Sequence, residues 1–235
     1  MAVVQKVRSR VDRLVDHGDH VHTVELATEV PVPRFRAGQF LHLALDEYEP
    51  GSFWPESRVF SIASPPEERR RLLLCYSARG RFTRRMEAEL STGRSVWVKL
   101  PYGDFVVDGS RPAVLFAGGT GITAFTTFVL SLGPGQQQPV LLAYGARRPG
   151  LLVFREALER RAESVSALKL LLFSEQPGDG VETGCLAVDR VWVSAAGFDR
   201  PLCYLSGPPA MIRTVRDQLT ERGVPTDDIR VDAWE

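Results

Sequence analysis

AVLFAGGTGI, residues 113–122, joins an apolar segment to a glycine-rich turn, and this joint decides the fold of the second half of the chain. The apolar segment has the composition of a buried strand, and residues 120–132 are predicted to form a helix. Glycines between a strand and a helix let a pyrophosphate approach backbone N–H groups. Because the spacing is not the G-x-G-x-x-G of many dinucleotide sites, the motif taken alone is better explained as a tight turn.

The same rhythm of apolar strand, turn and helix continues to the end of the chain. VLLAYG precedes a predicted helix over 154–162, LKLLLF follows it, and CYLSG precedes a predicted helix over 209–222. Pro209 in the first turn and Gly223 after the end suit the limits of that last helix. Apolar strands that alternate with helices predict a parallel sheet covered on both faces.

The first half of the chain has the pattern of short strands. Apolar residues alternate over residues 5–107 in the segments FLHLAL, RVFSIAS, LLLCYS and SVWVKL, which Gly, Pro and charged turns separate. A single helix is predicted over 83–90, so this half is predicted to be a closed antiparallel β-barrel. The boundary falls near 108–112, which predicts domains at 1–108 and 109–235.

Composition narrows the class of protein. The 235 residues include 29 Lys and Arg and 29 Asp and Glu, so the chain lacks the basic excess expected of a nucleic-acid binder. No apolar run approaches the roughly 20 residues of a membrane span, and the first ten residues do not resemble a signal peptide. We therefore expect a cytoplasmic protein with no membrane span that binds small molecules or proteins.

Cysteine and histidine positions bear on metals and redox groups. Cys75, Cys185 and Cys203 are too few and too scattered for an iron–sulfur cluster, and an odd number fits a reducing compartment. His20 and His22 form the one pair with ligand-like spacing, and they lack further partners in the sequence. We expect no metal site and interpret the histidines as structural.

Several short motifs, in their order, resemble the ferredoxin-NADP reductase superfamily. They are AGQF at 37–40, RVFSIAS at 58–64, a Gly-x-Phe-Thr at 80–83, PYGDF at 101–105, AGGTGI at 117–122, LSGPPAM at 205–211 and an aromatic residue near the C-terminus, Trp234. The resemblance spans nearly the whole chain. It implies a β-barrel that binds FAD, rather than FMN, followed by an α/β Rossmann-like domain that binds a nicotinamide coenzyme.

The resemblance assigns a flavin site to the barrel. Arg58 would reach the pyrophosphate, Phe60 would pack on the ring or the ribityl chain, and Ser61 would hydrogen-bond near the reactive ring nitrogen. Phe60 replaces the more usual Tyr, so the phenolic hydrogen bond is lost. Gly80 and Thr83 open a helix whose N–H groups suit the pyrophosphate, although Thr83 alternatively caps a surface helix. Four arginines crowd this segment and either neutralise phosphate, dock an acidic electron carrier or form a solvated face: Arg79, Arg81, Arg84 and Arg85.

The resemblance also assigns the nicotinamide site. The glycines of AGGTGI would shape the turn, Thr120 would touch the nicotinamide or the flavin, and the SGPPAM segment would lie against the nicotinamide. Ser206 stands where relatives often have Cys, so hydride transfer is expected to be slower but retained. Trp234 would stack on the flavin and move when nicotinamide binds, or it only completes the core at the last strand. Asp232 aligns with an acidic residue that assists proton and electron exchange.

Coenzyme preference follows from charge. NADPH-using relatives carry Ser-Arg and Thr-Gly-Arg where this chain has Ser174-Glu175 and Thr183-Gly184-Cys185. A carboxylate about 5 Å from a phosphate costs about 3 kcal/mol per unit charge at an effective dielectric near 20, before salt screening. Glu175 suits ribose hydroxyls instead, so we predict NADH. Arg147 and Arg148 would permit NADPH if they turned inward.

The candidate catalytic residues are Ser61, Thr120, Ser206 and Trp234, and the candidate cofactor-binding residues are Arg58, Phe60, Ser61, Ile62, Gly80, Arg81, Phe82, Thr83, Gly118, Gly119, Thr120, Gly121, Arg147, Ser174, Glu175, Gly207, Pro208, Met211 and Trp234. The resemblance implies an FAD-dependent NAD(P)H oxidoreductase that takes hydride onto flavin N5. It would pass electrons singly to a separate carrier such as ferredoxin, flavodoxin or an oxygenase component. The alternatives are a free-flavin or ferric-siderophore reductase, and an electron-transfer subunit of a larger complex.

Overall fold

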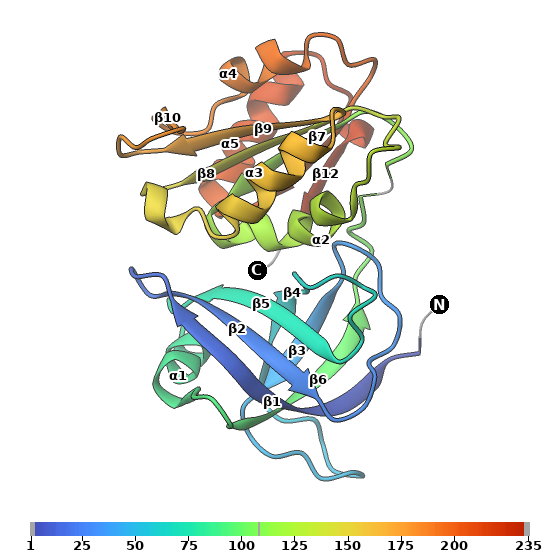
Figure 1. Ribbon diagram of the computed structural model, residues 1–235, viewed down its shortest axis with the longest axis vertical. Helices are drawn as coiled ribbons and strands as arrows, with labels where there is room; N and C mark the ends of the chain where they lie inside the picture. The colour runs from blue at the N-terminus through green and yellow to red at the C-terminus, as the bar shows by residue number, and fades with distance from the viewer. Residues whose placement is uncertain (1–2, 108, 233–235) are drawn as a thin grey trace. The chain divides into compact units, whose positions relative to one another are not determined.

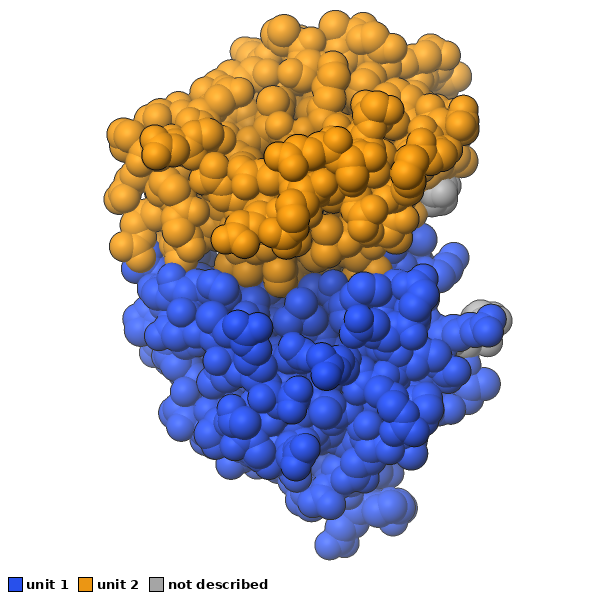
Figure 2. All heavy atoms as spheres, viewed as in Figure 1, with its two compact units in different colours: residues 1–106 blue, residues 107–235 orange. Residues whose placement is uncertain are grey.

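The computed structural model describes residues 3–107 and 109–232. The chain forms two compact units, residues 1–106 and residues 107–235, which Figure 2 draws in blue and orange. No helix in the described ranges combines the length and the apolar character that crossing a membrane requires.

The first unit is an antiparallel β-barrel (Figure 1). Its elements are β1 (Gln5–Asp16), β2 (Val21–Thr28), β3 (Phe40–Ala44), β4 (Ser57–Ser61), β5 (Arg71–Ser77), α1 (Arg81–Glu89) and β6 (Ser95–Tyr102). The strand order is β4-β3-β6-β1-β2-β5, and all neighbours pair antiparallel. Just beyond β4, the N–H of Ala63 donates to the carbonyl of Leu73 in β5 at 2.8 Å, so the barrel is nearly closed. The predicted barrel is therefore confirmed.

The single helix of the barrel is held by its apolar face. Phe82 and Met86 in α1, with Leu90 just after it, are buried in the same core as the inward side chains of the strands. α1 begins at Arg81, two residues before the predicted start. This leaves its first turn directly after Gly80, at the surface of the barrel.

The second unit is an α/β domain. Its strands are β7 (Ala113–Gly118), β8 (Val140–Ala146), β9 (Leu168–Ser174), β10 (Glu182–Thr183), β11 (Leu202–Ser206) and β12 (Ile229–Asp232). Its helices are α2 (Thr123–Ser131), α3 (Arg155–Ser164), α4 (Val188–Trp192) and α5 (Pro209–Glu221), with 3-10 turns η1 (Gly119–Ile122), η2 (Pro149–Leu151), η3 (Val193–Ala195) and η4 (Thr226–Asp228). The strand order is β10-β9-β8-β7-β11-β12, and every pair is parallel, which confirms the predicted parallel sheet.

Helices cover both faces of this sheet (Figure 1). α4 and α5 bury apolar side chains against one face, where Phe116 and Phe173 are fully buried, and α2 lies beside α3 on the other. The chain moves outward from β7 through β8 and β9, then returns to place β11 on the other side of β7. The strand order therefore reverses between β7 and β11. In open parallel sheets, ligands bind at the carboxyl ends of the strands at such a switch point.

Candidate functional site

The two glycine motifs meet where the strand order reverses. β7 ends in Gly118 and β11 ends in Ser206, and these strands are paired in register up to Ala117 and Ser206. A Cβ on Gly121 would lie 2.4 Å from the carbonyl oxygen of Ser206, and a Cβ on Gly207 would lie 2.9 Å from the nitrogen of Gly118. Only glycine allows backbones to approach this closely. The structure thus joins two motifs that lie more than 80 residues apart in the sequence.

Side chains of the second motif complete this junction. A Cβ on Gly118 would lie 2.5 Å from the sulfur of Met211 and 2.8 Å from Cδ of Pro208. By contrast, Gly119 has φ of +53° and no atom within 4 Å of its added Cβ. The turn is therefore packed against β11 on one side and open at Gly119 on the other.

A buried polar pair lies beside the junction. The hydroxyl of Ser206 donates to Oδ2 of Asp232 at 2.9 Å, and the two residues are 2% and 4% exposed. Thr120 is half-buried in η1, and its carbonyl accepts a hydrogen bond from the Thr123 hydroxyl at 2.8 Å. The structure therefore brings together Thr120, Ser206 and Asp232 on neighbouring chain segments. Trp234 lies outside the described residues.

The carboxyl ends of β8 and β9 continue the same edge. Ser174 is fully buried and its carbonyl accepts from the N–H of Gly184 at 2.7 Å, whereas Glu175 is exposed. Arg147, just beyond β8, is also exposed. A Cβ on Gly145, in β8, would lie 3.3 Å from Cβ of Leu186, so the segment after β10 crosses this edge.

In the barrel, the candidate flavin residues lie on β4, the first strand in the sheet order. Arg58 is exposed, Phe60 is half-buried with its ring 6.3 Å from that of Tyr76, and Ser61 is 9% exposed. Ile62, just after the strand, is fully buried. The side chain of Arg58 has no hydrogen bond or ion pair with any residue that the structure describes. The strand thus presents a free cation and a partly accessible aromatic face.

The first turn of α1 is organised by the Thr83 hydroxyl. Its oxygen accepts from the N–H groups of Arg79 and Gly80, each at 3.1 Å, and donates to the Gly80 carbonyl at 3.2 Å. The hydroxyl therefore bonds to its own turn. The N–H groups of the helix's first turn have no carbonyl partner within the helix, and in this turn Arg81 is exposed and Thr83 is half-buried, while Phe82 is buried.

Ion pairs fix α1 to the barrel. Arg81 bonds to Glu56, and Arg85 bonds to Asp46 at 2.8 Å and to Glu89 at 2.9 Å. The hydrogen bond from Arg85 is the main cause that lowers the pKa of Asp46 and of Glu89 below their usual values. Of the four arginines in the segment, Arg79 and Arg84 have no side-chain partner within the described ranges. Two of the four arginines, Arg81 and Arg85, are therefore held in ion pairs, and the side chains of the other two are free.

A third contact ties α1 to the β1–β2 hairpin. Oε1 of Glu87 lies 2.8 Å from Nε2 of His22 and 3.0 Å from Nδ1 of His20. These bonds, first that with His22, lower the pKa of Glu87. No group of three or more His, Cys, Asp or Glu residues able to hold a metal occurs in the described part of the chain.

The residues present fit the two cofactors. The exposed start of α1 and the free cations Arg84, on that helix, and Arg58, on β4, suit a diphosphate, because unpaired guanidinium and amide N–H groups are good anion ligands. In the second unit, the open face at Gly119 and the start of η1 leave the backbone accessible at the switch point. FAD would be held by the first set and a nicotinamide dinucleotide by the second.

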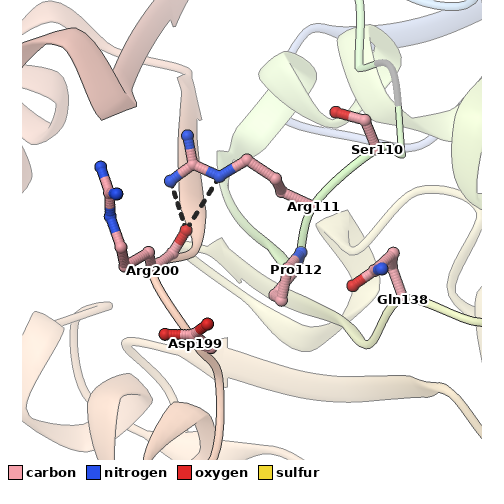
Figure 3. A pocket seen from close by; sticks show the side chains of 6 residues that line it. All are labelled: Ser110, Arg111, Pro112, Gln138, Asp199 and Arg200. Atoms are coloured by element: carbon pink, nitrogen blue, oxygen red, sulfur yellow. Dashed lines mark hydrogen bonds between the residues drawn. The ribbon is translucent and has the colours of Figure 1, made fainter.

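A hollow at the opposite edge of the α/β unit does not belong to this site (Figure 3). It measures about 430 Å³ and is lined by Ser110, Arg111, Pro112, Gln138, Asp199 and Arg200, which precede the strands they lead into. Arg111 donates to the carbonyl of Arg200 and to Oδ1 of Asp228 at 2.8 Å. The guanidinium therefore braces the amino ends of the strands.

The three cysteines differ in their burial. Cys75 is buried in β5, Cys203 is buried in β11, and Cys185 is exposed. Burial raises the pKa of Cys75 and of Cys203 to about 12. Both buried thiols therefore stay protonated at neutral pH and make poor nucleophiles.

Sequence reasoning missed contacts that join distant residues. Nothing in the spacing pointed to Glu56 as the partner of Arg81, or to Arg190 as a contact of the Thr183 carbonyl. β10 was missed because a strand of two residues carries no periodic pattern. The many charged residues of both signs were the one signal available, and they do not identify which residues pair.

Comparison with known proteins finds an NAD-binding domain family and several reductase components that are similar to the chain. Residues 115–217 match the family described as the oxidoreductase NAD-binding domain. The chain is 27% identical over 244 residues to the reductase component of propane 2-monooxygenase from Rhodococcus jostii. The aligned region covers 98% of this chain and 64% of the relative. It is 26% identical over 208 residues to reductase component 2 of terephthalate 1,2-dioxygenase from Comamonas, covering 86% and 60%. The chain thus spans about three fifths of these relatives.

Solved structures share the fold at low identity. The cytochrome P450 reductase GcoB from Amycolatopsis has a TM-score of 0.85 at 23% identity, covering 99% of this chain and 70% of that chain. A ferredoxin NADP+ reductase from Neisseria gonorrhoeae, solved with bound FAD and NADP, has a TM-score of 0.78 at 16% identity, covering 97% and 98%. The fold shared with these proteins includes both units.

Proposed function

We propose that the chain is a member of the ferredoxin-NADP reductase superfamily and that it is an FAD-dependent NAD(P)H oxidoreductase, which favours NADH and supplies electrons singly to a separate protein. The match to an NAD-binding domain and the fold shared with solved reductases support this proposal. The observation that carries the proposal is the junction at the switch point. There, Gly121 and Gly207 allow the ends of β7 and β11 to pack backbone against backbone. A chain without coenzyme chemistry has no need of both glycine motifs at one edge.

The barrel residues bind and orient the flavin. Arg58 and the first turn of α1 hold the diphosphate, Phe60 packs on the ring system, and Ser61 offers a hydrogen bond beside it. When bound, FAD supplies an acceptor for hydride from nicotinamide and a donor of single electrons. The ion pairs of Arg81 and Arg85 keep α1 at a fixed place on the barrel, which holds the diphosphate ligands in position.

The α/β unit binds and orients the coenzyme. Thr120 and the open turn at Gly119 meet the coenzyme, and Gly207 keeps the backbone of the second motif close to it. The Ser206 hydroxyl is fixed by its bond to Asp232, so it is oriented before the coenzyme binds. Positioning, rather than a general acid or base, is the contribution of these residues.

The preference for NADH rests on charge at the carboxyl end of β9. The exposed Glu175 repels a 2′-phosphate and accepts hydrogen bonds from ribose hydroxyls. Cys185, also exposed, supplies no cation at the position where NADPH-using relatives carry Arg. Arg147 lies at the end of the neighbouring strand and contacts the pyrophosphate in this proposal.

Two relatives indicate which class of protein accepts the electrons. Two relatives are named as reductase components of propane 2-monooxygenase and of terephthalate 1,2-dioxygenase. They support an oxygenase component or its small electron carrier as the acceptor of this chain. Stated more generally, the proposed acceptor is a separate electron carrier such as a ferredoxin or a flavodoxin.

The test is an anaerobic titration of the flavin-loaded protein with NADH and, separately, with NADPH. We expect the flavin absorbance band near ~450 nm to bleach rapidly and stoichiometrically with NADH, and slowly with NADPH. Faster bleaching by NADPH would contradict the coenzyme preference alone. If neither coenzyme bleached the flavin, the reductase proposal would be wrong and an electron-transfer subunit would explain the fold.

A further inference from the structure

Arg190, on the short helix α4, lies against the segment that follows β9 at the carboxyl edge. Its Nη1 donates to the carbonyl of Thr183 at 3.0 Å, and its Nη2 lies 2.6 Å from Oε2 of Glu182. The guanidinium carbon lies 4.9 Å from the centre of the Phe173 ring. Three contacts with two strands, β9 and β10, thus fix the orientation of one cation.

The topology places this cation on the adenosine side of the coenzyme. The glycine turn after β7 meets the diphosphate, and the Gly207 segment after β11 meets the nicotinamide half. The other half of the dinucleotide must then extend over β8 and β9. The Gly184 N–H bonds to the Ser174 carbonyl at 2.7 Å, so the Thr183–Gly184 backbone lies at the end of β9.

Arg190 is close enough to this backbone to affect a bound ribose. Its Nη1 would lie only 3.1 Å from a Cβ on Gly184, which has φ of +118°. Its side chain is 37% exposed and that of Glu182 is 44% exposed, so both are accessible to a ligand. With Glu175 exposed next to Ser174, two carboxylates and one cation surround the end of β9. Among these three residues the carboxylates therefore outnumber the cation.

We infer that Glu182 and Arg190 set coenzyme specificity: Glu182 holds the Arg190 guanidinium so that the site favours a ribose 2′-hydroxyl over a 2′-phosphate. This inference rests on the proposed function and adds residues outside the motifs that suggested NADH. The two terminal nitrogens of Arg190 are engaged by Glu182 and by a backbone carbonyl, so a phosphate would have to displace Glu182. Removing the Glu182 charge leaves Arg190 held by Thr183 and Phe173 and weakens the bond at Nη2, so that a phosphate can displace the neutral side chain.

The experiment compares two coenzyme fragments that differ in this phosphate. Binding of 2′,5′-ADP and of 5′-AMP to the flavin-loaded chain is measured by calorimetry for the wild type, E182Q and E182Q/R190Q. We expect the wild type to favour 5′-AMP. We expect E182Q to raise the ratio of association constants, 2′,5′-ADP over 5′-AMP, roughly tenfold, and R190Q to remove that gain.

A matched variant separates a local effect from loss of negative charge. Glu156 is an exposed carboxylate on α3 that pairs with Arg160 at 3.7 Å, so E156Q removes the same charge from the same unit. We expect E156Q to leave the ratio unchanged. An arginine that only braced β10 would change stability in R190Q and leave the ratio in E182Q at the wild-type value.

The outcomes distinguish this inference from the proposed function. If the wild type binds 5′-AMP and E182Q does not raise the ratio, or if the gain survives R190Q, the inference is wrong while coenzyme binding stands. A wild type that prefers 2′,5′-ADP overturns the inference and the NADH preference. A wild type that binds neither fragment overturns coenzyme binding itself and the inference with it.

Discussion

The two units prepare for a phosphate group in different ways. In the barrel, charged side chains add to the first turn of α1: Arg58 on β4 and Arg84 on α1 are exposed, and their side chains have no partner in the described residues. In the α/β unit, the ligand is backbone, and Gly121 and Gly207 pack so closely that no Cβ fits. A long side chain can still reach its ligand after a small shift of the backbone, and salt screens the attraction between its charge and the ligand. A site built from closely packed backbone instead needs the strands to keep their register. Charge therefore governs the first site and shape the second.

The largest effect on stability and coenzyme binding should come from disturbing the close backbone packing in the α/β unit. In G121A, the new Cβ would lie 2.4 Å from the Ser206 carbonyl oxygen, so the ends of β7 and β11 must separate. We expect unfolding free energy to fall by about 1–3 kcal/mol, and NADH binding to weaken more than about tenfold. Thermal unfolding and coenzyme titration check both effects.

G197A is the control for this substitution. An added Cβ on Gly197 meets nothing within 4 Å, and the residue is also in the α/β unit. Its stability and coenzyme binding should match those of the wild type. Normal NADH binding in G121A would mean that the junction does not shape the coenzyme site, and the contrast between the units would fail.

A smaller, salt-dependent effect is expected from removing charge in the barrel. Since Arg58 has no internal partner, R58Q should leave stability unchanged. A hydrogen bond to a charged group contributes about 1.5–3 kcal/mol, so FAD binding should weaken about tenfold to a hundredfold. The difference from the wild type should shrink at high salt. Fluorescence titration with FAD at two salt concentrations measures both.

Arg13 provides the matched control, because it is an exposed arginine on β1 of the same barrel. R13Q should bind FAD as the wild type does. Equal loss in R13Q and R58Q would show a general charge effect. A loss in R58Q that salt does not change would mean that Arg58 acts by packing, and the barrel site would resemble the α/β site.

The contrast also explains which features could be predicted from sequence. The strand, glycine turn and helix around residues 113–122 follow from local periodicity and backbone freedom, so both fold and switch-point motif were predictable. The Ser206–Asp232 bond and the Arg81–Glu56 pair join residues that are 26 and 25 positions apart, and no spacing rule links them. The Thr83 hydroxyl bonds to its own turn, which composition alone does not reveal.

The smallest predicted effect concerns pH and the helix that carries the barrel's phosphate ligands. Arg85 lowers the pKa of Asp46 and of Glu89 in the folded chain. Carboxyls with a lowered pKa stabilise the fold above their unfolded value, about 4, and lose that contribution as pH falls through the folded value. R85Q should therefore be slightly less stable at neutral pH and should lose less stability below about pH 4 than the wild type. Hydrogen exchange of α1 peptides across this range measures the difference.

The α/β unit provides the internal comparison for that measurement. Asp228 also has a lowered pKa, chiefly because Arg111 donates a hydrogen bond to it. Its acid response should persist in R85Q, since the two clusters lie in different units. R84Q, which removes a neighbouring cation without a described partner, should keep the wild-type slope at α1. If R84Q flattened that slope as much as R85Q, net charge rather than the Asp46–Arg85–Glu89 bonds would control the acid response, and α1 would be held by its apolar face alone.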